Sequence, residues 1–253
     1  MRLAAAHALV TGGGTGIGAA IARALAAEGA AVTLVGRRRE PLEAVAAGLD
    51  RAVAAPADVT DPDAVAGAFA AARAAHGPVS ILVNNAGAAA SQRFAKLTPE
   101  QLRAMLAINV EAAMFCCQAA LPDLLAAPAG RIVTVASTAG LKGYAYTAGY
   151  VAAKHAAIGM TRALATEFAR TPLTVNAVCP GFTDTDLVGD AVATIRAGTG
   201  RSEEEARGEL AKFNPQNRLV QPQEVADAVL WLCLPRAQSV TGQAIVVAGG
   251  EVM

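Results

Sequence analysis

The sequence predicts an α/β protein, a single doubly wound (Rossmann-like) domain with a seven-stranded parallel sheet and helices on both faces. Short apolar runs rich in β-branched residues alternate with longer helical segments along the chain. Near-continuous apolar strands are typical of a parallel sheet that is covered on both sides. A glycine-rich turn follows the first run and opens a helix, as in nucleotide-binding sheets. We expect residues 1–253 to form this one domain.

Seven segments are predicted as strands because each is short, apolar and bounded by turn or helix signals. They are Ala8–Thr11, Ala31–Val35, Val53–Ala57, Ile81–Asn84, Arg131–Ala136, Thr174–Val178 and Ala244–Val247. The segments between them are long enough for crossover helices. Gly29 marks the end of the first helix, and Thr98-Pro99-Glu100 opens a long helix toward Leu121.

Residues 187–214 depart from this alternation. The segment follows the end of a strand, holds Gly198, Gly200 and Gly208 and carries the acidic run Glu203-Glu204-Glu205. One interpretation is a mobile substrate lid over the site. The other is a solvated pair of surface helices, and the sequence does not choose between them.

Composition argues against several classes of protein. Lys+Arg and Asp+Glu are balanced at 21 each, so the basic excess of a general nucleic-acid binder is missing. The most apolar long segment, Ala112–Ala127, is interrupted by Gln118, Pro122 and Asp123, and a membrane span needs roughly 20 clean residues. The four cysteines form no C-x-x-C pair and have no histidine at ligand spacing. We therefore expect buried free thiols, no metal, no membrane helix and a cytoplasmic location.

The glycine-rich turn runs from Thr11 to Gly18 with the spacing T-G-x-x-x-G-x-G. Backbone N–H groups and the helix dipole at such a turn can hold a pyrophosphate. The alternative is an ordinary bend between a strand and a helix. The candidate cofactor-binding residues are Gly12, Thr15, Gly16, Ile17 and Gly18.

The end of the second predicted strand favours NADP over NAD. An acid at this position would bind the adenosine ribose, but the chain has Gly36 followed by Arg37, Arg38 and Arg39. Each charge-assisted hydrogen bond to a 2′-phosphate contributes about 1.5–3 kcal/mol, which gives a preference of roughly 10- to 100-fold. Arg37 is the leading candidate and Arg38 the second, although Arg38 and Arg39 also fit a solvated helix start.

A further pair of residues, Asp58 and Val59, follows the third predicted strand. The carboxylate can accept a hydrogen bond from an adenine amino group.

The candidate catalytic residues are Ser137, Tyr150 and Lys154. Tyr150 and Lys154 are four residues apart, so a helix places them on one face. Tyr150 can supply a proton if its pKa, near 10 when unperturbed, is lowered by roughly 2–3 units, and Lys154 with the oxidised nicotinamide ring is the expected cause. Ser137 ends a predicted strand and can polarise a carbonyl. No histidine stands at triad spacing, so hydrolase chemistry is not supported.

Together these motifs, in this order, resemble the short-chain dehydrogenase/reductase family over nearly the whole chain. The resemblance implies that Asn85, Ala86 and Gly87 line the adenosine side of the cofactor. It implies that Pro180, Gly181 and Thr183 frame the nicotinamide. It also implies that Asn109, within the long helix, holds a water that passes protons to Lys154. Turns and a solvent-facing asparagine are the plainer interpretations of the same residues.

The resemblance implies an NADP(H)-dependent oxidoreductase that interconverts a ketone and a secondary alcohol. Residues 150–182 are similar to 3-oxoacyl-thioester reductases and aromatic polyketide ketoreductases, so we expect a 3-oxoacyl thioester of a carrier protein or coenzyme A. The alternatives are an alcohol, sugar or 3-hydroxyacyl-CoA dehydrogenase that uses NAD(H), and a nucleotide-sensing protein without turnover. In the family, the equivalents of helices Pro99–Leu121 and Val151–Ala169 pair between subunits, so a homotetramer is expected.

Overall fold

In the computed structural model, which describes residues 1–253, seven parallel strands form one sheet in the order β3-β2-β1-β4-β5-β6-β7. The predicted fold class is confirmed. The chain winds outward from β1 to β3 and then crosses to β4 on the other side of β1. Ligands of such sheets bind where this reversal leaves a crevice at the carboxyl ends of the strands. The strands are β1 (His7–Thr11), β2 (Ala31–Gly36), β3 (Ala52–Pro56), β4 (Ile81–Asn84), β5 (Arg131–Val135), β6 (Thr174–Pro180) and β7 (Ala244–Val247).

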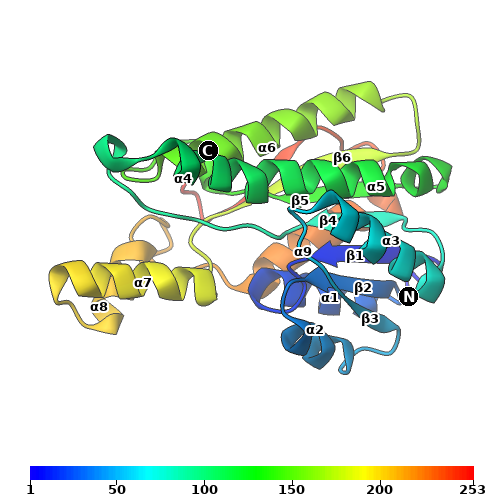
Figure 1. The fold of residues 1–253 in the computed structure, drawn as a ribbon, viewed down its shortest axis with the longest axis horizontal. Helices are drawn as coiled ribbons and strands as arrows, with labels where there is room; N and C mark the ends of the chain where they lie inside the picture. The colour runs from blue at the N-terminus through cyan, green and yellow to red at the C-terminus, as the bar shows by residue number, and fades with distance from the viewer.

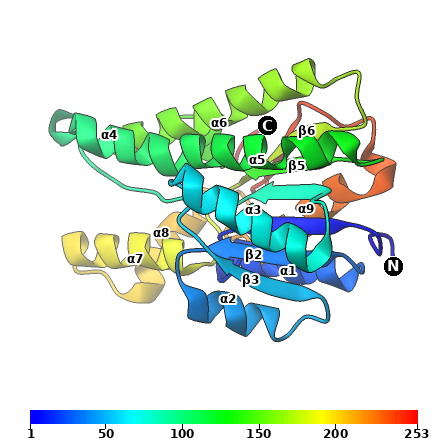
Figure 2. The same ribbon diagram turned by 45° about the vertical axis from the view of Figure 1, so that its right-hand side comes forward.

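Helices cover both faces of the sheet (Figures 1 and 2). On one face lie α1 (Gly16–Ala27), α2 (Arg39–Ala46) and α9 (Pro222–Cys233), and on the other lie α3 (Pro62–His76), α5 (Ala112–Ala126) and α6 (Ala148–Glu167). Alternate residues of β1 serve the two cores: Ala8 and Val10 belong to the first and Leu9 to the second. Because both faces are buried, the strands have no solvent-exposed side, which is why most of their residues are apolar.

The long helix begins where the sequence predicts and runs further. Thr98 caps it, accepting from the Gln101 N–H at 3.3 Å while the Gln101 side chain accepts from the Thr98 N–H at 3.0 Å. The helix consists of α4 (Pro99–Leu106), a π-helical turn (Ala107–Glu111) and α5. By length and composition alone, Pro99–Ala126 is apolar enough to cross a membrane, a test that core helices of soluble proteins also pass. Its α5 part packs on the sheet through buried residues such as Ala120 and Leu124.

Residues 187–214 hold most of a helix pair, α7 (Asp186–Thr199) and α8 (Glu203–Ala211). Both views show this pair projecting from the body at the end where α4 begins (Figures 1 and 2). The two helices bury a small apolar cluster between them, which includes Val192 and Leu210. The pair therefore has its own core and is attached to the body at its two ends.

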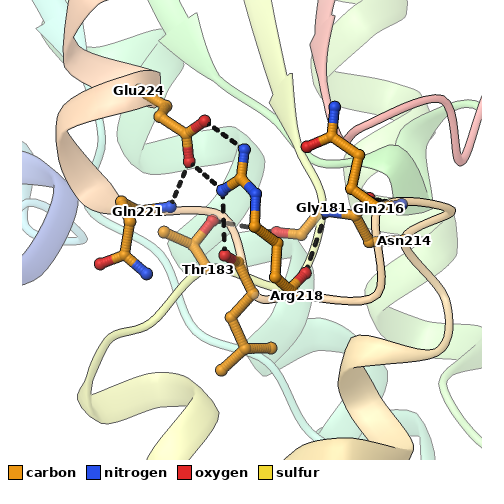
Figure 3. Close-up of polar contacts among 8 residues, drawn as sticks. Gly181, Thr183, Asn214, Gln216, Arg218, Gln221 and Glu224 are labelled. Atoms are coloured by element: carbon orange, nitrogen blue, oxygen red, sulfur yellow. Dashed lines mark hydrogen bonds and ion pairs between the residues drawn. The ribbon is translucent and has the colours of Figure 1, made fainter.

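The segment that leads from α8 back to the body is fixed against the loop after β6 (Figure 3). Val220 pairs with Thr183 in an isolated parallel bridge. Arg218 donates two hydrogen bonds to the carboxylate of Glu224, at 2.6 and 2.7 Å. The buried Asn214 amide donates to the Arg218 carbonyl at 2.9 Å. The bridge to Thr183 holds the loop after β6, which borders the predicted nicotinamide site, and the other two contacts hold the segment that carries Val220.

The four cysteines are all buried and free, as the sequence predicts. Burial raises the pKa of all four thiols, to about 12 for Cys116 and Cys233 and to about 11 for Cys117 and Cys179. They are small apolar side chains of the core.

Candidate active site

One cleft, with a volume of about 470 Å³, opens at the carboxyl ends of the strands where β1 and β4 adjoin. Every predicted catalytic and cofactor-binding residue lines it except Gly18. Residues that are far apart in the sequence meet here because parallel strands all end at the same edge of the sheet.

The glycine turn is shaped by backbone conformation and by close packing. Gly12 and Gly16 have φ values of 64° and 49°, which non-glycine residues rarely adopt. A Cβ atom on Gly18 would lie 2.1 Å from the Gly12 carbonyl oxygen, so Gly18 lets α1 lie directly against the turn. Thr15 caps α1 without a side-chain hydrogen bond, and the first turn has no acid. The first N–H groups of α1 are therefore open to an anion.

Asn85 binds the end of β4 to this turn. Its side-chain amide donates to the carbonyl oxygens of Thr11 and Gly12 at 3.0 and 3.2 Å. The Thr11 hydroxyl in turn accepts from the backbone N–H groups of Asn85 and Ala86, both at 3.0 Å. Asn85 therefore shapes the turn from inside, while Ala86 and Gly87 continue along the cleft wall.

The adenosine end of the cleft carries opposite charges. Arg37 and Arg38 both line it, whereas Arg39 begins α2 and pairs with Glu43 at 3.1 Å. Asp58 accepts hydrogen bonds from the N–H and hydroxyl of Thr60, and these bonds, with a smaller contribution from Arg37, lower the pKa of its carboxyl group. Asp58 is an ionised acceptor beside two guanidinium donors.

These features fit a nicotinamide adenine dinucleotide phosphate. The open helix N-terminus suits the pyrophosphate, the two arginines suit a 2′-phosphate and Asp58 suits the adenine amino group. Gly87 also needs to lack a side chain, because a Cβ there would lie 2.8 Å from the Asn109 amide oxygen. The groups suited to each part of the cofactor line one cleft.

Ser137 and Lys154 converge beside Tyr150 at the other end of the cleft. Ser137 follows β5, and its oxygen accepts from the Ala139 N–H at 3.1 Å, so its hydroxyl proton is free to be donated. Tyr150 and Lys154 lie on α6, with the Lys154 ammonium 5.7 Å from the centre of the Tyr150 ring. The ammonium donates to the Val135 carbonyl at 3.0 Å.

The pKa values at this end follow from burial. Lys154 is buried, which lowers the pKa of its ammonium to about 8. Burial raises the pKa of the Tyr150 phenol, and the Ser137 hydroxyl, close by but outside direct hydrogen-bonding geometry, partly counteracts this effect. In the protein alone the pKa of Tyr150 is raised, because loss of water around the phenol outweighs any distant charge. The lowering of this pKa by Lys154 together with the oxidised nicotinamide stays a prediction. A raised pKa keeps the phenol protonated at neutral pH, the state that a proton donor needs.

Asn109 lies in the π-helical turn and is buried. Its amide nitrogen donates to the carbonyl oxygens of Ala88 and Met105, each at 3.0 Å, while its amide oxygen is buried without a partner. A Cβ atom placed on Gly87 would lie 2.8 Å from the Asn109 amide oxygen and 3.6 Å from the Lys154 ammonium, so both groups are close to Gly87. The water relay between them stays a prediction.

The substrate side of the cleft contains residues that sequence reasoning did not single out. Thr138, Tyr144 and Phe182 line it. Lys142 and Tyr144 follow Thr138 within six residues, and no motif marked them. Glu251, which contacts both, gave no sequence signal at all.

Comparison with known proteins places the chain among enzymes of one family. The model of the short chain dehydrogenase family matches residues 6–196. A Streptomyces violaceoruber protein assigned as ketoacyl reductase 1 of the granaticin polyketide synthase is 39% identical over 96% of this chain and 92% of that protein. Galactitol 2-dehydrogenase (L-tagatose-forming) of Cereibacter sphaeroides is 38% identical over 98% of this chain and 96% of the relative. A crystal structure of an actinorhodin polyketide ketoreductase variant with NADPH superimposes with a TM-score of 0.92 at 37% identity, covering 97% of each chain.

Proposed function

The chain belongs to the short-chain dehydrogenase family and is an oxidoreductase, and we propose that it uses NADPH to reduce the ketone of a 3-oxoacyl thioester. The observation that carries the reaction class is the convergence of Ser137, Tyr150 and Lys154 at one end of a cleft that fits the cofactor. The thioester is supported by the similarity to proteins named as polyketide ketoreductases. A carrier protein or coenzyme A would hold the acyl group.

The chemistry divides among three side chains. Bound NADPH supplies the hydride. Ser137 donates its free hydroxyl proton to the carbonyl oxygen and draws charge toward it. Tyr150, protonated because burial raises its pKa, gives its proton to the same oxygen as negative charge develops there.

Lys154 is held by the Val135 carbonyl, with its remaining protons available to a ribose hydroxyl and to the phenol. Its positive charge would stabilise the phenolate that remains after proton transfer.

NADPH is proposed over NADH because Arg37 and Arg38 line the adenosine end of the cleft. Arg39 is occupied by Glu43 and is left out of this role. Asp58 follows β3 and not β2, so it can accept from adenine without standing at the position that would bind the ribose or repel a 2′-phosphate.

The helix pair α7–α8 is proposed as a substrate lid. Leu187, Val188 and Ala191 of α7 line the cleft. One ion pair, between Arg207 of α8 and Asp184, ties the pair to the loop after β6. An element that opens and closes over a substrate is expected to have only a small number of such contacts with the body.

Two alternative functions are distinguishable by one experiment. The first is an alcohol or sugar dehydrogenase, favoured by the polar substrate wall around Thr138 and Tyr144. The second is a nucleotide sensor without turnover. Absorbance of NADPH and of NADH is followed with a panel of 3-oxoacyl thioesters, simple ketones and sugars.

Oxidation of NADPH with the thioesters, at kcat/KM above that for the other substrates, is the expected result. Faster turnover of a sugar or a simple ketone would show that this compound class, and not the thioester, is the substrate. No oxidation with any substrate would favour the sensor.

Assembly as a cytoplasmic homotetramer is also proposed. Small residues such as Gly159 leave open space along the outer side of α6, and Met114 is exposed on α5. Close approach of two helices needs such surfaces. Light scattering after size exclusion would give four times the chain mass of 25.5 kDa, and a monomer would overturn the proposal.

A further inference from the structure

Tyr144 joins three parts of the chain beside the catalytic residues. Its hydroxyl lies 2.6 Å from the Thr138 hydroxyl and donates to the carboxylate of Glu251. Its ring contacts Phe182, after β6, and Phe213, after α8, with ring centres 6.1 and 5.7 Å apart. Thr138 directly follows Ser137, and both line the same cleft as Tyr144.

Glu251 fixes the direction of every proton in the group. Its side chain is 1% exposed, and the Lys142 ammonium lies 3.1 Å from the same carboxylate oxygen that Tyr144 contacts. A carboxylate held by an ammonium is ionised and can only accept hydrogen bonds. The Tyr144 proton therefore points to Glu251, and the Thr138 proton must point to Tyr144.

With the protons in these directions, the Thr138 and Tyr144 hydroxyl groups present only hydrogen-bond acceptors to the cleft. Thr138 and Tyr144 have each used their single proton, while each oxygen keeps an unfilled lone pair. Both residues line the cleft. The second carboxylate oxygen of Glu251 is also buried without a partner, against Gly181 in the same wall. A substrate group that donates a hydrogen bond would satisfy such a wall, and a group that only accepts would not.

We propose that Thr138 and Tyr144 form an acceptor subsite for a hydroxyl group on the acyl chain, with Glu251 as the positioning residue that orients it. The substrate class is then a hydroxylated 3-oxoacyl thioester. The subsite proposal rests on the proposed ketone reduction. It adds a second recognition point to the carbonyl itself.

The test uses three substrates that differ at one position: the N-acetylcysteamine thioesters of 3-oxohexanoate, 5-hydroxy-3-oxohexanoate and 5-methoxy-3-oxohexanoate. The methyl ether keeps the oxygen and removes the donor. We expect kcat/KM for the hydroxyl compound to exceed that for the methyl ether by roughly 3- to 10-fold, the effect of one net hydrogen bond. Equal values, or a preference for the ether, would overturn the subsite.

Variants test the assignment through the ratio of kcat/KM for the hydroxyl compound to kcat/KM for the methyl ether. A general loss of activity cancels in this ratio. Tyr144→Phe removes the acceptor and is expected to bring the ratio close to one. Tyr146→Phe is the matched control, because Tyr146 is 62% exposed and lies outside this cleft. A ratio that survives in Tyr144→Phe, or that is lost in Tyr146→Phe, contradicts the assignment.

Glu251 is tested by a conservative pair. Glu251→Gln keeps an oxygen that can accept from Tyr144, so the ratio is retained. Glu251→Ala frees the Tyr144 proton to face the cleft, so the ratio falls to one or reverses toward the ether. A merely structural role would lower all rates and leave the ratio alone.

Failure of the subsite and failure of the proposed function give different results. If another ketone class is turned over faster than the thioesters, the same hydroxyl and methoxy comparison is made in that class, and the thioester is abandoned. If no ketone is turned over, both inferences fall.

Discussion

The pH dependence of ketone reduction follows from the burial of Lys154. In the proposed mechanism, reduction needs Lys154 charged and Tyr150 protonated. Burial lowers the pKa of Lys154 to about 8 and raises that of Tyr150, so Lys154 loses its proton first as the pH rises. With one pKa at about 8, kcat/KM at pH 9 is expected to be about a tenth of its value at pH 6, and at pH 10 about a hundredth.

The assay is the initial rate of NADPH oxidation at saturating NADPH and low ketone, from pH 6 to 10 at constant ionic strength. Thermal unfolding at each pH shows whether the protein remains folded. Alcohol oxidation, measured in parallel, should rise with pH because it needs a deprotonated Tyr150. A reduction profile that stays flat to about pH 9.5 with folded protein would refute the assignment of a neutralisable, buried Lys154.

Three further changes test other parts of the site. Arg37→Asp should raise KM for NADPH roughly 10- to 100-fold and raise KM for NADH far less. Arg39→Ala is the control and should change neither KM. Equal losses for both cofactors would remove Arg37 from the 2′-phosphate role. Tyr150→Phe should lower kcat by roughly 100-fold or more while the Kd for NADPH, from fluorescence titration, changes little; substantial residual turnover would place the acid elsewhere. Gly18→Ala puts a methyl group 2.1 Å from the Gly12 oxygen, so Tm and NADPH affinity should both fall, by about 1–3 kcal/mol in stability; an unchanged Tm would contradict the close packing of α1.

The sheet could be predicted because burial on both faces leaves a direct mark on the sequence. The alternation of Ala8, Leu9 and Val10 between two cores needs three apolar residues in a row, and such runs are easy to find. Strand ends were less accurate. The last predicted strand residue before the cleft was Val178, whereas β6 continues to Pro180, which pairs with Val247. Proline and glycine signalled a turn there, but a proline at the end of a strand loses little because its missing N–H is at the edge of the ladder.

The cofactor side of the site was predictable for a related reason. The turn near Gly12 requires glycine because of its backbone conformation and close contacts, so the chemistry of the site restricts which residues can occur. The pKa of Tyr150 was not predictable, because its sign depends on how much water the fold removes. The contact between Tyr144 and Glu251 joins residues 107 positions apart, and no local pattern connects them.

Substrate choice in this fold must therefore depend on few positions. Relatives that are 39% and 38% identical to this chain carry the names of a ketoacyl reductase and a galactitol dehydrogenase, so identity over the whole chain does not select a substrate. The residues that select it must line the cleft and be replaceable without disturbing the glycine turn or Lys154. Tyr144 meets both conditions, because it lines the cleft and its hydroxyl contacts Thr138 and Glu251 and not the cofactor side. Glu251, whose side chain is buried, acts through Tyr144. Replacing Glu251 with a residue that cannot accept a hydrogen bond would free the Tyr144 proton to point into the cleft. The cleft would then favour a substrate group that accepts a hydrogen bond over one that donates it.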